Sequence, residues 1–137
     1  MQKEQASFEQ ATILVCGGAG FMGSNFIRYV LAQYPNVRII TVDALTYAGN
    51  TDNLLGLPAE RYEFIKGNIC DQALMQKLMA RAEYVVNFAA QTHVDRSIHG
   101  ESAAFIESNI VGVHSLLEAL RKSPNIQKMI QVSTDEV

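Results

Sequence analysis

Two features near the start of the chain could together bind a dinucleotide: a glycine-rich turn and a carboxylate that follows it. The turn, Gly17 to Gly23, lies between the apolar run Thr12 to Val15 and a helical pattern, and Asp43 ends the next apolar run, twenty residues after the last glycine. Glycines let backbone N–H groups approach a pyrophosphate, and the positive end of the following helix attracts that anion. An acid at this distance accepts hydrogen bonds from a ribose 2′-hydroxyl and repels a 2′-phosphate. The sequence therefore predicts NAD rather than NADP.

Alternating strands and helices must position these residues. The strands are short, continuous apolar runs, and the helices repeat apolar residues every three or four positions. The sequence predicts strands at 12–16, 37–42, 62–66, 84–88 and 128–133, and helices at 21–34, 71–80 and 100–122. The long last helix has a clear apolar stripe formed by Ile106, Ile110, Val113, Leu117 and Leu120.

This alternation predicts an α/β fold, a Rossmann-type doubly wound parallel sheet with helices on both faces. Right-handed crossovers give the strand order 3-2-1-4-5. We expect a polar N-terminal tail over residues 1–11 and one NAD-binding domain over residues 12–137, truncated after the fifth strand and without a substrate domain. Ligands of such sheets bind at the carboxyl ends of the strands, so the candidate residues should gather there.

Composition excludes several classes of partner. The chain has 137 residues, of which 48% are hydrophobic and 18% charged, and a net charge of −3. It can bury a core, and it lacks the basic runs that bind nucleic acid or anionic membranes. No apolar stretch approaches the roughly 18 residues of a membrane span. Together with the absence of a signal-peptide pattern and of a disulfide framework, this predicts a cytoplasmic location.

Metal binding is not expected from the cysteines and histidines. Cys16 and Cys70, the only cysteines, match no paired metal-ligand spacing, and Cys16 is expected to be a small buried residue. His93, Asp95 and Arg96 form a pattern more typical of a structural hydrogen-bond network than of a metal site or a charge relay.

Four segments together resemble one enzyme family. GGAGFMGSN, LTYAGN, FAAQTHVDRS and the final STDEV, in this order, are similar to the N-terminal part of dTDP-glucose 4,6-dehydratases, which are extended short-chain dehydrogenases/reductases acting on nucleotide sugars. The resemblance covers nearly all of the chain from Thr12. It implies an NAD-dependent lyase that converts dTDP-glucose to dTDP-4-keto-6-deoxyglucose, and a homodimer in which the helix at 100–122 contributes to a four-helix bundle.

The resemblance also implies the residues that contact the cofactor. They are Gly17, Gly20, Phe21, Met22, Gly23, Asp43, Ala44, Leu45, Thr46, Asn68, Ile69, Phe88, Ala89, Ala90, Gln91, Thr92 and Ser108. Four positions differ from the family pattern: Ala44 is usually Lys, Asn68 is usually Asp, Gln91 is often Glu, and Ser108 matches a cofactor-contacting Thr. Asn109, in the middle of its predicted helix, is expected to bond to backbone rather than to a ligand.

The catalytic residues implied by the resemblance lie after the fifth strand. Asp135 would be the acid that protonates the leaving C6 hydroxyl, Glu136 the base that removes the C5 proton, and Thr134 a substrate contact, with Thr92 also near the sugar. Repulsion between neighbouring carboxyls favours a proton on one of them, as this division of roles requires. A solvated acidic chain end is the alternative interpretation of these two acids.

The superfamily's Tyr and Lys, four residues apart on a helix after the fifth strand, have no counterpart here. The one pair with that spacing, Tyr62 and Lys66, falls in a predicted strand, where four residues span about 13 Å. We therefore expect a fragment of a longer enzyme that is inactive alone. Two alternatives remain: a sugar-nucleotide epimerase or decarboxylase, and a non-catalytic NAD-binding module.

Overall fold

The residues that the structure describes form a five-stranded parallel sheet with helices on both faces. The computed structural model describes residues 8–92, 100 and 102–134. Its strand order, β3-β2-β1-β4-β5, is the predicted one. The elements are β1 (Thr12–Cys16), α2 (Phe21–Gln33), β2 (Arg38–Asp43), the 3₁₀ turn η1 (Thr51–Leu54), β3 (Tyr62–Lys66), α3 (Gln72–Met79), β4 (Tyr84–Asn87), α5 (Ser102–Ile106), the π-helical segment η2 (Glu107–Val111), α6 (Gly112–Arg121) and β5 (Lys128–Gln131).

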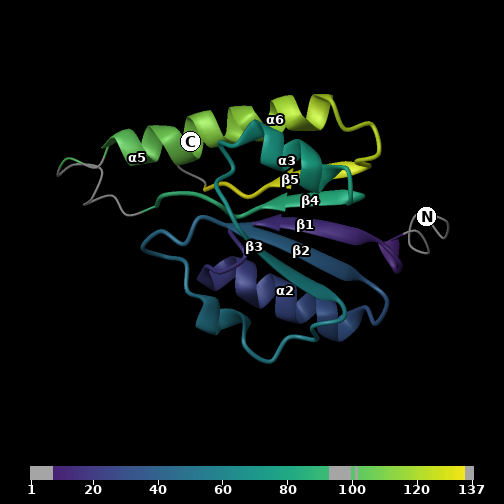
Figure 1. Cartoon of the computed structure of the whole chain (residues 1–137). Helices are drawn as coiled ribbons and strands as arrows, with labels where there is room; N and C mark the ends of the chain where they lie inside the picture. The colour runs from purple at the N-terminus through teal and green to yellow at the C-terminus, as the bar shows by residue number, and fades with distance from the viewer. Residues whose placement is uncertain (1–7, 93–99, 101, 135–137) are drawn as a thin grey trace.

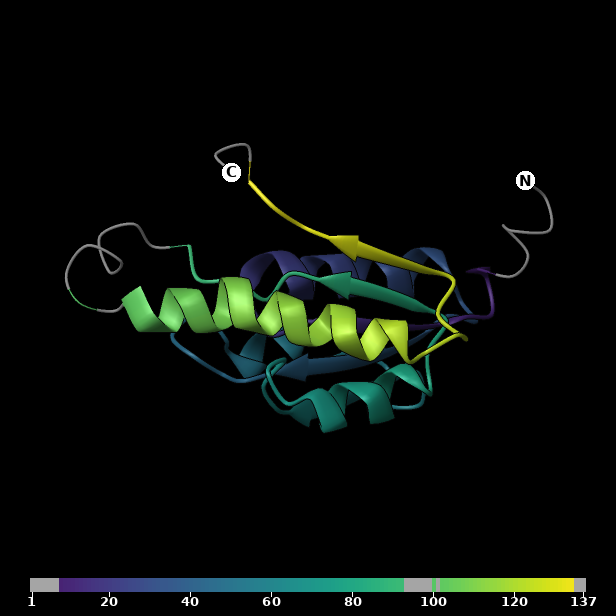
Figure 2. The ribbon, with the colours of Figure 1, turned by 90° about the horizontal axis from the view of Figure 1, so that it is seen from above.

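Strand β1 lies at the centre of the sheet and contributes side chains to two hydrophobic cores, one on each face. Ile13 and Val15 point to the face covered by α2, whereas Leu14 and Cys16 point to the face covered by α3 and α6. Figure 1 shows α2 on one side of the sheet and the other two helices on the opposite side, and Figure 2 shows α3 and α6 side by side. Because both faces are covered, the strand is apolar and buried at each position from Ile13 to Cys16, which explains why the sequence shows no alternation there.

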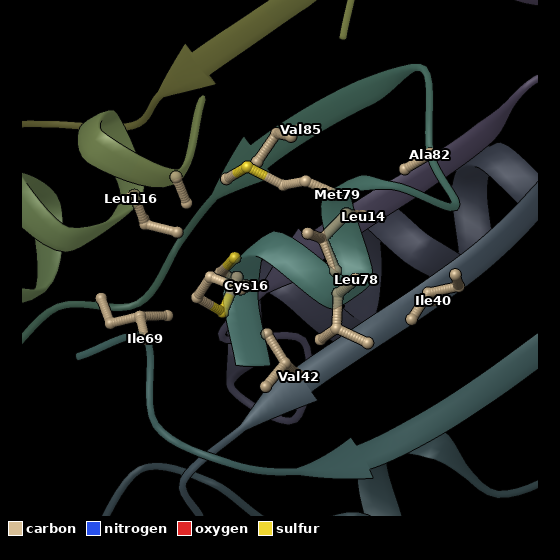
Figure 3. Packing of buried hydrophobic residues seen from close by; sticks show 12 residues of the cluster. Leu14, Cys16, Ile40, Val42, Ile69, Leu78, Met79, Ala82, Val85 and Leu116 are labelled. Carbon is tan, nitrogen blue, oxygen red and sulfur yellow. The ribbon is translucent and has the colours of Figure 1, made fainter. Parts of the chain in front are cut away.

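The core beneath α3 and α6 is closely packed (Figure 3). Cys16 is fully buried, as predicted, and lies among Val42, Ile69 and Leu116. Burial raises the pKa of the Cys16 thiol to about 12, and the negative charge of Asp43 adds to the rise. The thiol therefore stays protonated and acts as a small apolar side chain.

The predicted helix at 100–122 differs from the expectation in two ways. It is interrupted by the five-residue π-helical segment, and three of the five residues of its apolar stripe face solvent, whereas Leu120 packs against the core as expected. Ile106, Ile110 and Leu117 are 53%, 63% and 50% exposed. The buried face of α6 instead consists of Gly112, Ser115, Leu116 and Ala119. Small residues let the helix approach its neighbours closely, and a Cβ on Gly112 would lie 2.5 Å from Cδ1 of Ile69 in the loop after β3. The spacing of apolar residues correctly predicted a helix here, but it did not show which of its two faces packs against the core.

The amino-terminal end of the sheet is closed by aromatic side chains. Part of the expected tail belongs to the folded domain, because the ring of Phe8 packs edge-on against Tyr34 and Tyr84, with centroids 5.0 and 5.4 Å away. Ala11 is buried, and its carbonyl accepts a hydrogen bond from Arg38 N. The apolar ring supplies contacts that a solvated tail would lack.

Element boundaries otherwise agree with the prediction to within one or two residues. Tyr34 caps α2 rather than continuing it, β2 extends to Asp43, and β5 ends at Gln131. Tyr62 and Lys66 lie in β3, as expected, so they cannot act as a helical pair. In the described part of the chain, no helix has the length and apolar character needed to span a bilayer.

Candidate cofactor-binding site

The glycine turn is shaped by close backbone contacts. Gly17 has a positive φ of 76°, and a Cβ there would lie 2.6 Å from Ala89 N. A Cβ on Gly23 would lie 2.3 Å from Gly17 O, so the first turn of α2 packs directly on the glycine turn. Both positions need glycine for the fold itself.

Gly20 differs, because the protein leaves space around it. A Cβ at this position would have Gly17 O at 3.5 Å and Ala48 O at 4.0 Å as its nearest neighbours. Its backbone is extended, with φ −76° and ψ 173°, which any residue adopts. Gly20 is also the N-cap of α2, and no side chain within the described ranges caps the helix. The positive end of α2 thus opens onto free space that suits an anion.

Asp43 is oriented by two backbone hydrogen bonds. Its Oδ2 accepts from Ala19 N at 2.9 Å, and its Oδ1 accepts from Leu45 N at 2.8 Å. The first bond joins the end of β2 to the glycine turn, so the sequence's two dinucleotide features meet in space. Each carboxylate oxygen keeps a lone pair with which it can accept from a diol.

A cleft opens at the carboxyl ends of the strands and collects most of the predicted cofactor residues. The predicted residues that line it are Gly17, Gly20, Asp43, Ala44, Thr46, Asn68, Ile69, Phe88, Ala89, Ala90, Gln91 and Ser108. They come from the ends of β1 to β4 and from η2, which lie far apart in the sequence. Asp43 is the one charged side chain among the described lining residues.

Other predicted residues lie beside the cleft rather than in its lining. Phe21 and Met22, at the start of α2, direct their side chains to solvent, with 81% and 60% exposed. Gly23 is buried under the turn, Leu45 packs on the α2 core, and Thr92 is exposed. Thr134 is exposed beyond β5. The predicted acid and base, Asp135 and Glu136, lie outside the described residues, as do His93, Asp95 and Arg96.

The wall opposite Asp43 is held by asparagine side chains. Asn109, in the π-helical segment, accepts from Gln91 N at 2.8 Å and donates to Gln91 O at 2.9 Å. Its predicted bonding to backbone is confirmed. The buried Asn87 accepts from Ala89 N at 3.0 Å and donates to Gln131 Oε1 at 2.8 Å. These bonds fix the path of the chain after β4, which lines the cleft. A π-helical turn at this place follows the tendency of such segments to occur at functional sites.

Asn68 and Cys70 shape the loop after β3. Asn68 Oδ1 accepts from Cys70 N at 2.9 Å, so part of its hydrogen-bonding capacity holds a local turn. Cys70 Sγ donates to Glu107 O at 3.4 Å. Burial raises the pKa of this thiol, and so does the charge of Glu107. The part of the chain that the structure describes contains no cluster of three or more potential metal ligands.

Sequence reasoning missed four lining residues, Val42, Ala48, Gly49 and Gly67. Gly67 had a usable signal, because it follows β3 directly and strand ends line such sites. Gly49 is close to the acid, and a Cβ there would lie 2.8 Å from Asp43 Oδ1. Backbone amides, one helix terminus and one carboxylate can bind a diphosphate and a diol. Within the described lining, however, the cleft has no pair of groups for acid–base chemistry.

Comparison with known proteins gives consistent matches. The chain is 48% identical over 126 residues to the low-salt glycan biosynthesis protein Agl12 of Haloferax volcanii, covering 91% of this chain and 40% of the relative. It is 44% identical over 131 residues to a dTDP-glucose 4,6-dehydratase of Actinoplanes sp., with the same coverage. The chain thus spans about 40% of the length of these relatives.

A solved structure extends the likeness to three dimensions. The dTDP-glucose 4,6-dehydratase DesIV of Streptomyces venezuelae, crystallised with NAD, superposes with a TM-score of 0.84 at 44% identity, over 92% of this chain and 40% of that one. The resemblance to dTDP-glucose 4,6-dehydratases and the Rossmann-type fold are confirmed. The model of the family described as GDP-mannose 4,6 dehydratase matches residues 14–137, from the central strand through the glycine turn, the acid and the strand ends. This chain belongs to that family.

Proposed function

We propose that the cleft binds NAD. The observation that carries this proposal is the position of Asp43, which is held by the glycine turn beside the uncrowded Gly20. In this arrangement the backbone around Gly20, Phe21 and Met22 binds the diphosphate at the start of α2, and Asp43 accepts from the adenosine ribose. DesIV, which was crystallised with NAD, supports the assignment.

The other predicted cofactor residues, in the cleft lining and beside it, are assigned to the two ends of the dinucleotide. Asn68 and Ile69 contact the adenine, and Ala44, Leu45 and Thr46 complete the adenosine side. Ser108 is a further cofactor contact. On the other side of the glycine turn, the segment Phe88 to Thr92 meets the nicotinamide half. The two hydrogen bonds of Asn109 to the Gln91 backbone hold that segment in place at the cleft.

We further propose that the complete protein is a nucleotide-sugar 4,6-dehydratase acting on dTDP-glucose. Bound NAD supplies a hydride acceptor that can return the hydride later in the reaction. Asp135 gives a proton to the C6 hydroxyl, Glu136 removes the C5 proton, and Thr134 and Thr92 contact the sugar. The dehydratase relatives at 44% identity support this proposal.

The exposed stripe on α5, η2 and α6 is proposed as the contact with a second copy of the chain. Ile106, Ile110, Val111 and Leu117 leave about half or more of their surface in water. Contiguous apolar side chains on one helix are costly to expose and typically mark an interface. Replacing Ile110 with Glu should shift the complete protein from dimer to monomer in analytical ultracentrifugation, whereas an unchanged sedimentation coefficient would contradict the proposal.

Calorimetric titration tests the cofactor proposal. The wild-type chain should bind NAD⁺ more tightly than NADP⁺, because Asp43 repels the 2′-phosphate. Asp43→Asn should weaken NAD⁺ binding and reduce the discrimination. Tighter or equal binding of NADP⁺ by the wild type would contradict the role of Asp43. If the wild type bound neither cofactor, the proposal that the cleft binds NAD would be wrong. For the activity, the complete protein should convert dTDP-glucose to a 4-keto-6-deoxy product, and a C4 epimer would identify an epimerase instead.

A further inference from the structure

Ala19 of the glycine turn is held by hydrogen bonds to both its N–H and its carbonyl. Its N–H donates to Asp43 Oδ2 at 2.9 Å. Its carbonyl accepts two hydrogen bonds from the loop after β2, one from Asn50 N at 3.1 Å and one from Asn53 Nδ2 at 2.9 Å. Figure 1 shows this loop returning to the start of α2, where it forms the single turn of η1. The loop after β2 and the glycine turn are thus joined at the carbonyl of the buried Ala19.

Asn53 is itself held in place by helix α2. The Arg28 guanidinium donates to the carbonyl oxygens of Asn53 and Leu55 at 2.8 and 2.7 Å. Asn53 N also donates to Asn50 O at 3.1 Å, within η1. These bonds fix the backbone of Asn53, and the backbone in turn places the Asn53 carboxamide where it donates to Ala19 O.

The orientation of Ala19 O sets the position of Gly20. The carbonyl and the following N–H belong to one rigid planar group, so fixing the oxygen also fixes the direction of Gly20 N–H and the start of α2. Gly20 lines the cleft, whereas Asn53 is not among the described lining residues. We propose that Asn53 is a positioning residue that holds the diphosphate-binding turn in its binding geometry without contacting the cofactor. This inference rests on the proposed NAD binding.

The test compares Asn53→Leu and Asn53→Ala with Asn50→Ala in the full chain. Leu keeps the branched shape of Asn and removes the donor, and neither Asn53 variant adds a charge near the diphosphate. Asn50→Ala removes the side chain that caps η1 through Asp52 N at 2.9 Å, but it retains the Asn50 N–H bond to Ala19 O. It is therefore a matched control for disorder of the loop.

We expect both Asn53 variants to bind NAD⁺ about tenfold more weakly by calorimetry, the effect of one lost hydrogen bond, and Asn50→Ala to bind like the wild type. Amide hydrogen exchange at Gly20 and Phe21 should be faster in the Asn53 variants without cofactor. Wild-type affinity in a folded Asn53 variant would overturn the inference, as would an equal loss in Asn50→Ala. If Asn53→Leu does not fold, Asn53→Ala decides by the same criterion. A wild type that does not bind NAD⁺ would overturn the proposed function and this inference with it.

Discussion

Replacing Gly20 with Ala should separate cofactor binding from stability. The new methyl group would have no protein atom closer than 3.5 Å and would project from a backbone conformation that alanine adopts freely. The smaller entropy of the unfolded chain favours alanine by about 0.4–1 kcal/mol, and the poorer N-cap costs a similar amount. The free energy of unfolding should therefore change by less than about 1 kcal/mol, or roughly 4 °C in Tm.

The same methyl group occupies the space in which the diphosphate would lie. Loss of one or two hydrogen bonds to a charged group costs about 1.5–3 kcal/mol, so NAD⁺ should bind about ten- to a hundredfold more weakly. Thermal unfolding followed by circular dichroism gives the first quantity, and calorimetric titration gives the second.

Gly23→Ala is the matched control, because its methyl group collides with protein rather than with ligand. At 2.3 Å from Gly17 O, the new Cβ must displace backbone, and we expect a loss of about 1–3 kcal/mol in unfolding free energy. Wild-type NAD⁺ affinity in Gly20→Ala, or a loss of stability equal to that of Gly23→Ala, would refute the assignment of the free space at Gly20 to a ligand.

Three further predictions concern stability. Asn109→Leu should lower the free energy of unfolding in urea by about 1–2 kcal/mol, because both bonds to the Gln91 backbone are lost. Phe8→Ala should cost about 2–3 kcal/mol through its contacts with Tyr34 and Tyr84, and Phe8→Leu should recover part of this in the same measurement. The unfolded Cys16 thiol ionises near pH 9 and the folded thiol only near pH 12, so stability should fall by up to about 1.4 kcal/mol per pH unit between these values. In Cys16→Ala the decline in stability should begin only near pH 10, where the Tyr62 hydroxyl ionises in the unfolded chain, because burial and Asp43 raise the pKa of Tyr62 in the folded protein to about 12. A decline that still began near pH 9 in this variant would contradict the burial of the thiol proton.

The sequence correctly predicted the features that follow from a local motif or from the general rules of sheet topology. The turn from Gly17 to Gly23 and the position of Asp43 follow from a motif in which each residue type has one physical task, and the strand order follows from the handedness of crossovers. The cleft therefore assembled largely as expected. Gly67 was missed although its place directly after the predicted strand at 62–66 was a usable signal.

Features that depend on three-dimensional packing could not be predicted in the same way. The inner face of α6 is formed by Gly112 and Ala119, whose small size matters only when the facing Ile69 is known. The stripe at Ile106, Ile110 and Leu117 is more apolar and was the stronger periodic signal, although it is exposed. Asn53 carried no motif, because its bond to Ala19 O joins residues 34 positions apart.

The cleft walls come from the ends of β1, β2, β3 and β4, which are neighbours in the sheet but are distributed over more than 70 residues of the chain. No local segment could hold a dinucleotide by itself. A bound cofactor would thus make the centre of the sheet more cooperative, since releasing any one strand would also release the ligand. At a hundredfold excess over Kd, this linkage adds about 2.7 kcal/mol to global unfolding and leaves the fraying of β5, which supplies none of the described lining residues, nearly unaffected.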